Sequence, residues 1–414
     1  MSRKNSILII LAATLLIVGG LLFFYFSNID TTQSTADQTQ TTTSPFGGSS
    51  PNRPVETTKT GVGASGQGGV SEKNLSQLIQ IYKSPSSGSV FSVNKNGQNI
   101  LKFVDRAVGN IYEYSPESQT GEGVRITNTT IPKIQETVWS NSGNDLVLRY
   151  LENDTDNISS FSGKIISGSS TPTELTGLFL PSNIKQLVIN PTGNRLFGLV
   201  DKSDRSGSLG FISNLDGSGR RTIFDSPISY FNISWPKEDT VAFTTKPNYR
   251  EPGMLFFFNT QNYSMNKVLG NILGLSTVVN KNINMLAYSY IENSSFYLDV
   301  YDIVNKTGSG YKITTLADKC VWGNTNTKVL YCAIPKTIPS GNYPDVWYQG
   351  LVSFSDDIWR IDMETGIINQ IYEIGSNETV DIDAYELKTS LDDKYLVFTN
   401  KTDLSLWLLN INQK

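Results

Sequence analysis

The segment Ile189-Asn190-Pro191-Thr192-Gly193-Asn194-Arg195-Leu196 decides the fold, because it joins two apolar strands through a short polar turn. The same arrangement recurs as Trp139-Ser140-Asn141-Ser142-Gly143-Asn144-Asp145-Leu146 and as Ser234-Trp235-Pro236-Lys237-Glu238-Asp239-Thr240-Val241. Weaker copies end at Ile100, Leu286, Val329 and Leu396. The turn therefore occurs seven times between Asn94 and Phe398.

The spacing of these turns indicates the architecture. Counted at Gly97, Gly143, Gly193, Glu238, Ile283, Asn326 and Asp393, the intervals are 46, 50, 45, 45, 43 and 67 residues. Repeats of about 45 residues built mainly from β segments are typical of propeller blades. We therefore expect residues 73–414 to form an all-β, seven-bladed β-propeller with four-stranded blades. Propellers carry many unrelated functions, so the fold alone names none.

Each repeat is predicted to contain four strands, from its alternating pattern and its turn residues. In the third repeat they cover 184–189, 195–200, 207–213 and 221–224, and the glycines of the turn 214–219 permit positive φ. The last repeat provides only three strands, whereas Leu75 to Ile81 has no partner in the first blade. We expect this segment to complete the last blade and close the ring, which removes both exposed sheet edges.

The repeats resemble a known family. A Trp-Ser or Trp-Pro turn is followed by an apolar strand and then by an aromatic strand ending in Asp or Asn, as in 297–302, 358–362 and 406–410. This pattern is similar to the WD-like propeller repeats of the periplasmic TolB type, from about Ser71 to the C-terminus. The resemblance implies a fold but no activity. The turns at 280–283 and 323–326 lack the Pro and Gly of the pattern, so spacing assigns those two blades.

The N-terminal region predicts a membrane anchor. Residues Ile7 to Phe26 are apolar and uncharged, long enough for a helix to cross the hydrocarbon layer. Arg3 and Lys4 precede this stretch and no basic residue follows before Arg53, so residues 1–6 are expected in the cytoplasm and the propeller outside it. The alternative is a cleaved signal peptide, although the aromatic run 23–26 is a poor approach to a cleavage site.

Residues 27–72 are predicted to form a low-complexity flexible linker, rich in Thr, Ser, Gln, Gly and Pro. Anchor, linker and propeller together also resemble membrane-anchored envelope proteins of candidate-phyla bacteria, a resemblance that implies no activity. Two of the 34 basic residues precede the anchor, which leaves 32 basic against 38 acidic residues beyond it. This balance does not favour nucleic acid. We expect the membrane and an envelope protein or glycan as partners.

The chain contains no His, which excludes Ser-His-Asp and Cys-His catalysis and imidazole metal sites. We therefore expect no enzyme, no catalytic, cofactor-binding or metal residues, and no cofactor. The loop 152–157 begins like a calcium loop but lacks the Gly at position six and the Glu at position twelve. This loop and the acidic pairs Asp356-Asp357 and Asp381-Ile382-Asp383 are interpreted as surface.

The 67-residue interval contains an insertion, predicted from Ile334 to Ser355. Connections between second and third strands emerge on the face that carries the links between blades, usually the binding face of a propeller. Aromatic side chains beside a carboxylate suit a sugar or a peptide, so Tyr343, Asp345, Trp347 and Tyr348 are the candidate binding residues. The alternative is a structural cap that buries its own Trp.

The two cysteines, Cys320 and Cys332, flank a predicted hairpin centred on Asn326, which would place them opposite each other. An oxidising envelope allows a disulfide, and two buried thiols are the alternative.

The sequence thus predicts a membrane-anchored, extracytoplasmic β-propeller that acts as a non-catalytic protein- or glycan-binding or scaffolding module. The alternative is a carboxylate-dependent hydrolase or lyase acting on envelope polysaccharide. An enzyme of that kind needs at least two acidic groups that converge in a deep pocket, whereas a scaffold needs an accessible patch.

Overall fold

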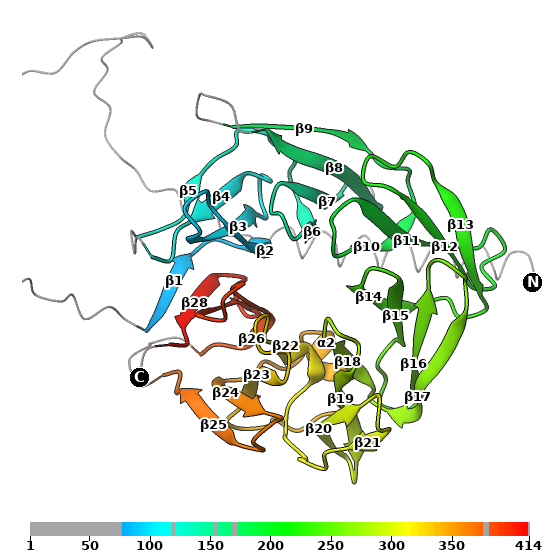
Figure 1. The fold of residues 1–414 in the computed structure, drawn as a ribbon, viewed down its shortest axis with the longest axis vertical. Helices are drawn as coiled ribbons and strands as arrows, with labels where there is room; N and C mark the ends of the chain where they lie inside the picture. Colours follow the sequence, from blue (N-terminus) through cyan, green and yellow to red (C-terminus); the bar gives the residue numbers. More distant parts are fainter. Residues whose placement is uncertain (1–76, 118–120, 153–155, 167–172, 376–380, 413–414) are drawn as a thin grey trace, which may run out of the picture. The chain divides into compact units, whose positions relative to one another are not determined.

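The computed structural model describes residues 77–117, 121–152, 156–166, 173–375 and 381–412. These residues form seven four-stranded antiparallel sheets, which lie around a common axis as the blades of a propeller (Figure 1). The predicted seven-bladed β-propeller is confirmed.

The first four blades follow the order of the chain, and each runs from its innermost to its outermost strand. Blade 1 contains β2 (Ser86–Val93), β3 (Asn99–Asp105), β4 (Ile111–Tyr114) and β5 (Val124–Arg125), and blade 2 contains β6 (Ile134–Trp139), β7 (Asp145–Leu151), β8 (Ile158–Ile166) and β9 (Glu174–Phe179). Blade 3 contains β10 (Ile184–Ile189), β11 (Arg195–Asp201), β12 (Ser208–Asn214) and β13 (Arg221–Ser226), and blade 4 contains β14 (Phe231–Lys237), β15 (Thr240–Thr245), β16 (Pro252–Asn259) and β17 (Met265–Leu273).

The remaining blades complete the ring. Blade 5 contains β18 (Ser276–Val279), β19 (Met285–Glu292), β20 (Ser295–Asp302) and β21 (Thr307–Gly308), and blade 6 contains β22 (Cys320–Trp322), β23 (Val329–Pro335), β24 (Asp356–Asp362) and β25 (Ile368–Tyr372). Blade 7 contains β26 (Ala384–Thr389), β27 (Tyr395–Asn400) and β28 (Leu406–Asn410), with β1 (Leu78–Tyr82) as its outermost strand. Two short helices lie between strands, the 3-10 helix η1 (Ala317–Lys319) and α2 (Asp345–Tyr348).

The ring is closed by the N-terminal strand, as predicted. β1 pairs antiparallel with β28, so that Leu78 lies opposite Leu409 and Gln80 opposite Trp407. Ile81 is fully buried and packs in one cluster with Phe91 and Phe103 of blade 1. The same short strand therefore completes blade 7 and fills the junction between blade 7 and blade 1.

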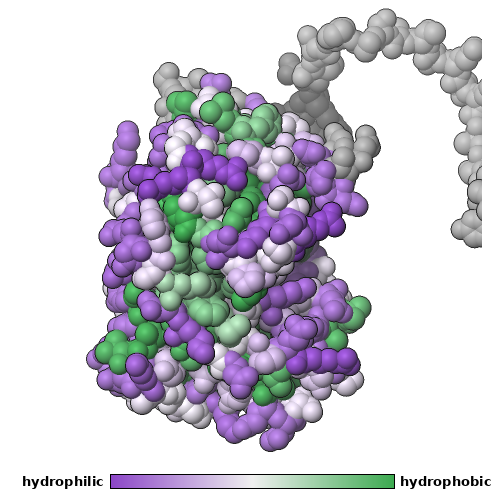
Figure 2. All heavy atoms as spheres, turned by 90° about the vertical axis from the view of Figure 1, so that its right-hand side faces the viewer, coloured by the Kyte–Doolittle hydropathy of each residue, from purple (hydrophilic) through white to green (hydrophobic). Residues whose placement is uncertain are grey.

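Large apolar side chains fill the space between neighbouring blades. Phe224 of blade 3 and Phe243 of blade 4 are stacked with ring centroids 4.6 Å apart, and Phe197 meets Phe243 edge-on at 5.6 Å. Such aromatic pairs add to the free energy gained by burying their area. Along the outer edge of blades 3 and 4, hydrophilic side chains alternate with apolar patches (Figure 2), a composition that disfavours edge-to-edge pairing with other chains.

Several of the recurring turns carry a hydrogen-bonding side chain at their first residue. The Asn190 side-chain oxygen accepts hydrogen bonds from the backbone N–H groups of Asn194 and Arg195, and the Ser390 hydroxyl accepts those of Lys394 and Tyr395. Asn280 does the same in the weak fifth copy. There Ile283 adopts a positive φ of 51°, where the second and third copies have Gly143 and Gly193. The capping side chain therefore holds the turn even without glycine.

Cys320 and Cys332 lie directly opposite each other on β22 and β23 and form a disulfide. The two strands of this hairpin therefore pair symmetrically about Asn326, as expected. β23 extends to Pro335, because Ile334 and Pro335 still pair with Asp357 and Asp356. The insertion consequently covers residues 336–355, two residues shorter than predicted.

Within the described residues, no helix has the length and apolar character needed to span a membrane. The predicted anchor at 7–26, the linker at 27–72 and the centre of the acidic loop at 152–157 lie outside the described residues.

Replacing Ile81 by Ala should lower the free energy of unfolding of the propeller by about 3 kcal/mol, because it leaves a cavity at the junction that closes the ring. Replacing the neighbouring, partly exposed Gln80 by Ala should change it by no more than about 0.5 kcal/mol. Denaturant unfolding of a chain that begins at Lys73 measures both values. Equal stability of the two variants would contradict closure through β1.

Candidate functional site

The candidate site lies on the face of the propeller that carries the links between blades and the connections between second and third strands, which we call the upper face. The link before β14 contributes Tyr230, the connection after β15 contributes Lys246 and Pro247, and α2 lies in the connection between β23 and β24. The insertion on blade 6 therefore emerges on the face expected from the sequence.

The insertion is anchored by its own aromatic side chains. Tyr343 and Trp347 are 4% and 3% exposed, and they pack with Phe296, Leu316 and Phe354. The Tyr343 ring lies 4.6 Å from that of Phe296 and 5.7 Å from that of Phe354, centroid to centroid. Two of the four predicted binding residues thus belong to a small core beneath the insertion.

A buried ion cluster lies against this core. The Lys319 ammonium donates hydrogen bonds to Asp356 Oδ2 at 2.8 Å, to Asp383 Oδ1 and to the Ala384 carbonyl at 2.9 Å. All three charged side chains are completely buried. The interpretation of Asp356 and Asp383 as surface residues was wrong, because a carboxylate can be buried when a cation and hydrogen bonds compensate its charge. Sequence spacing gives no sign of this pairing.

The cluster holds the insertion directly. Asp383 Oδ2 accepts hydrogen bonds from Trp347 Nε1 at 2.9 Å and from the Phe354 backbone N–H at 3.0 Å. The Lys319 ammonium also lies 5.3 Å from the Trp347 ring centroid and 5.2 Å from that of Phe354, within the range of a cation–π interaction. Burial raises the pKa of Asp356 to about 6, against the opposing effect of Lys319.

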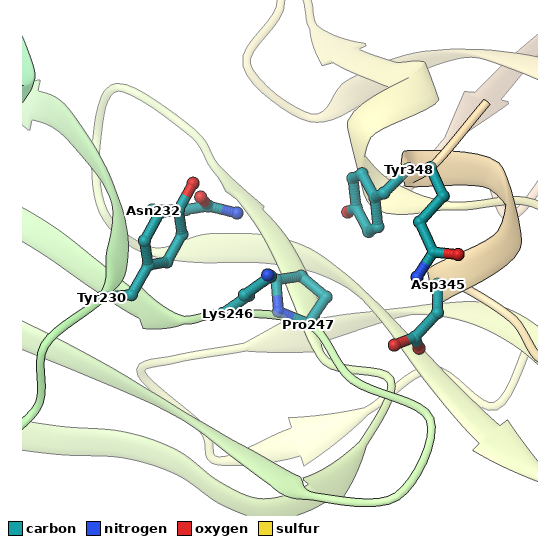
Figure 3. A pocket seen from close by; sticks show the side chains of 7 residues that line it. Tyr230, Asn232, Lys246, Pro247, Asp345 and Tyr348 are labelled. Atoms are coloured by element: carbon teal, nitrogen blue, oxygen red, sulfur yellow. The ribbon is translucent and has the colours of Figure 1, made fainter. Parts of the chain in front are cut away.

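The upper-face recess is a cavity of about 350 Å³ between blade 4 and α2. It is lined by Tyr230, Asn232, Lys246, Pro247, Asp345, Tyr348 and Gln349. Figure 3 shows Tyr230 and Asn232 on one wall, Tyr348 and Asp345 on the opposite wall, and Lys246 and Pro247 between them. A second hollow of about 660 Å³ over blades 2 and 3 shares Tyr230 with the recess, so the two adjoin.

The polar groups on the α2 side of the recess already have partners. Asp345 accepts a hydrogen bond from the Tyr249 backbone N–H at 2.7 Å, which ties α2 to the connection after β15. The Tyr348 hydroxyl donates to Asp318 at 2.6 Å, while 39% of its side chain remains exposed. Enclosure of the hydroxyl and the negative charge of Asp318 raise the pKa of Tyr348, so it is neutral at physiological pH.

The blade 4 side of the recess presents a cation and an aromatic face. The Tyr230 hydroxyl accepts a hydrogen bond from Gln186 Nε2 at 3.1 Å, and the Lys246 ammonium lies 5.7 Å from the Tyr230 ring centroid. Among the described residues, no carboxylate lies within salt-bridge distance of Lys246. The recess thus offers one uncompensated positive charge, two tyrosine rings and two amide side chains, which suit a polar or anionic ligand.

The sequence indicated only part of this site. Asp345 and Tyr348 line the recess, whereas Tyr343 and Trp347 face the core of the insertion. Whether any of the four contacts a ligand stays a prediction. Tyr230 and Lys246 were missed because they belong to an ordinary repeat. Their positions before the first and after the second strand of blade 4, on the same face as the insertion, were the available signal.

Comparison with known proteins supports the fold alone. No family model matches the chain, and no curated protein matches it. The crystal structure of oligogalacturonate lyase from Vibrio parahaemolyticus is similar with a TM-score of 0.51 and 10% identity, covering 80% of this chain and 90% of that chain. The β-propeller domain of the Trilobed protease from Pyrococcus furiosus is similar with a TM-score of 0.48 and 12% identity, covering 78% and 98%.

Replacing Trp347 by Ala should lower the free energy of unfolding by about 3–5 kcal/mol, because it empties part of the core and leaves the Asp383 carboxylate short of one donor. Replacing its neighbour Tyr348 by Ala should cost only about 0.5–1 kcal/mol, because that ring is partly exposed. Thermal and denaturant unfolding of the two variants measure the difference. Similar losses would show that the insertion is not anchored through Trp347.

Proposed function

We propose that this propeller is a non-catalytic binding or scaffolding module that holds an envelope protein or glycan in the upper-face recess. The observation that carries the proposal is the unpaired Lys246 ammonium between two exposed tyrosines, Tyr230 and Tyr348. A lysine that forms no salt bridge offers its charge to a ligand, and tyrosine rings offer large contact areas at low entropic cost.

The carboxylates around the recess favour binding over catalysis. Asp345 accepts a backbone N–H, and Asp318 accepts the Tyr348 hydroxyl. General acid–base chemistry requires a carboxyl group free to exchange a proton with the substrate. These two groups instead fix the position of α2 and of the Tyr348 ring.

A photo-reactive amino acid in place of Gln349 should form adducts with the ligand in native envelopes, because Gln349 is exposed in the recess. The control position is Leu391, which is also exposed but lies in a turn between first and second strands on the opposite face. Adducts from position 349 alone are expected. Equal labelling from both positions, or labelling from Leu391 only, contradicts the proposal.

Replacing Tyr230 or Lys246 by Ala should then weaken capture of the identified ligand by about 5–30-fold, which corresponds to about 1–2 kcal/mol. The melting temperature should stay nearly unchanged, because both side chains are exposed. Tyr263, on the outer edge of blade 4, has a similar exposure, and its replacement by Ala is the matched control. An equal loss in the Tyr263 variant would place the contact outside the recess.

We also propose that the propeller is displayed outside the cytoplasm on a single N-terminal helix, as in the membrane-anchored propellers of candidate-phyla bacteria and with TolB-type repeats. The charge asymmetry around residues 7–26 supports this orientation. Protease added to right-side-out membranes should cut within 27–72 and release a folded fragment, since exposed polar linkers are preferred cleavage sites. Protection of the whole chain would reverse the topology.

A carboxylate-dependent hydrolase or lyase acting on polysaccharide is the second candidate, and Glu386 is the observation that favours it. Glu386 is an exposed residue of β26, an innermost strand, and has a positive φ of 53° at a bulge. Although Glu386 is accessible to solvent, the protein around its carboxylate limits hydration and raises its pKa, against the opposing effect of Lys388 and with a smaller contribution from Glu136 of blade 2. Strained backbone and a raised carboxyl pKa both occur at active sites. Polysaccharide cleavage that Glu386→Gln abolishes would support this candidate over the binding module.

A further inference from the structure

The buried cluster around Lys319 brings together the groups needed to form an amide bond between two side chains. The Lys319 ammonium contacts the carboxylates of Asp356 and Asp383, and no atom of the three side chains is exposed. Lys319 ends the link into blade 6, whereas Asp383 directly precedes β26 of blade 7. The two residues are 64 positions apart, so a bond between them would join neighbouring blades covalently.

We propose that Lys319 Nζ and Asp383 Cγ become joined by an intramolecular isopeptide bond, with Asp356 carrying the protons of the reaction. This modification is independent of the ligand proposed above.

The reaction balances without any further reagent. Transfer of one proton from the Lys319 ammonium to the Asp383 carboxylate, which are in contact, first gives a neutral amine and a carboxylic acid. The amine electron pair then attacks Asp383 Cγ and forms the N–C bond of a tetrahedral intermediate. Loss of Oδ1 with two protons releases one water molecule and leaves an amide.

Asp383 is the acceptor because its second oxygen is held by two donors. Trp347 Nε1 and the Phe354 N–H both donate to Asp383 Oδ2, the atom that carries negative charge in the tetrahedral intermediate and becomes the amide oxygen. Fixed donors aimed at a developing oxyanion are a strong source of rate enhancement. The Lys319 ammonium contacts the other oxygen, Oδ1, so the nucleophile and the leaving oxygen are already adjacent.

Asp356 is placed to move the protons. Its Oδ2 accepts from Lys319 Nζ at 2.8 Å and from the Ala384 N–H at 2.7 Å, whereas its Oδ1 is buried without any hydrogen-bond partner. Oδ2, which contacts Nζ, can receive the proton that leaves nitrogen, and the Asp356 carboxyl group can return a proton to the departing oxygen. Burial raises the pKa of Asp356 to about 6, close to the value that suits proton transfer in both directions near neutral pH.

The aromatic side chains around the cluster exclude the water that would hydrolyse the new amide bond. Trp347 and Phe354 cover the Lys319 ammonium on the side of the insertion. An amide formed in this position is therefore protected from hydrolysis. The same contacts make the insertion a structural part of the reaction site, since residue 347 and residue 354 both supply donors to Asp383.

Mass spectrometry of the full-length chain tests the proposal without any substitution. After reduction of the disulfide, the chain should be lighter than its sequence by the mass of one water molecule. Trypsin cannot cut after an acylated lysine, so residues 313–328 should be recovered uncut and joined to residues 361–388 as one branched peptide. Recovery of 313–319 and 320–328 as separate linear peptides, with the full sequence mass, would overturn the proposal.

Three variants assign the roles. Lys319→Arg keeps the positive charge but has no amine that can form this amide, so it should keep its full mass. Asp356→Asn removes the proton carrier and should slow the loss of water at least tenfold while Lys319 and Asp383 remain.

Lys401→Arg is the matched control. Lys401 Nζ also lies near the Trp347 ring, at 5.0 Å from its centroid, but has no carboxylate contact among the described residues. This variant should lose water as the unmodified sequence does. Unchanged water loss in Asp356→Asn would overturn the role of Asp356, and the peptide map of the unsubstituted chain decides the bond itself even where a variant fails to fold.

Discussion

Closure of the ring by β1 is the constraint on which the rest of the structure depends. Every blade is held by its two neighbours, so a free edge between blades 7 and 1 would expose both a strand and an interblade core. β1 removes both at once, because its backbone pairs with β28 while Ile81 packs against blade 1. Closure fixes the position of each blade in the ring. It therefore also fixes the positions of the upper-face residues that the blades carry.

The insertion on blade 6 is the element that departs from the regular repeat and forms one wall of the upper-face recess. Its aromatic residues were expected to contact a ligand, but the Tyr343 and Trp347 side chains instead pack against the propeller and hold the insertion in place. The buried Lys319 cluster completes the attachment through Asp383. Breaking a buried charge pair is costly, so the cluster strongly favours one placement of α2. α2 in turn supplies one wall of the upper-face recess, opposite Tyr230.

The side chains of the upper-face recess differ in kind from those of the buried cluster. The recess combines two tyrosine rings, amide side chains and the Lys246 ammonium, which forms no salt bridge within the described residues. The carboxylates of Asp345 and Asp318 instead hold α2 in place. The side chains of Lys319, Asp356 and Asp383, in contrast, are completely enclosed. The exposed recess and the buried ion cluster are thus two separate arrangements of polar side chains, and both adjoin the insertion on blade 6.

The sequence by itself determined the architecture, because each strand and turn is a local pattern repeated about every 45 residues. Third-blade strands were predicted within two residues of their ends, and the unpaired N-terminal segment indicated the closing strand. Tertiary structure alone decided which side chains meet. In the sequence, Asp356 and Asp383 have the pattern of ordinary surface acids. Only the fold places Lys319 between them, although it is 37 residues from Asp356 and 64 residues from Asp383. Tyr230 carries no motif, and becomes a site residue only because ring closure places blade 4 opposite the insertion on blade 6.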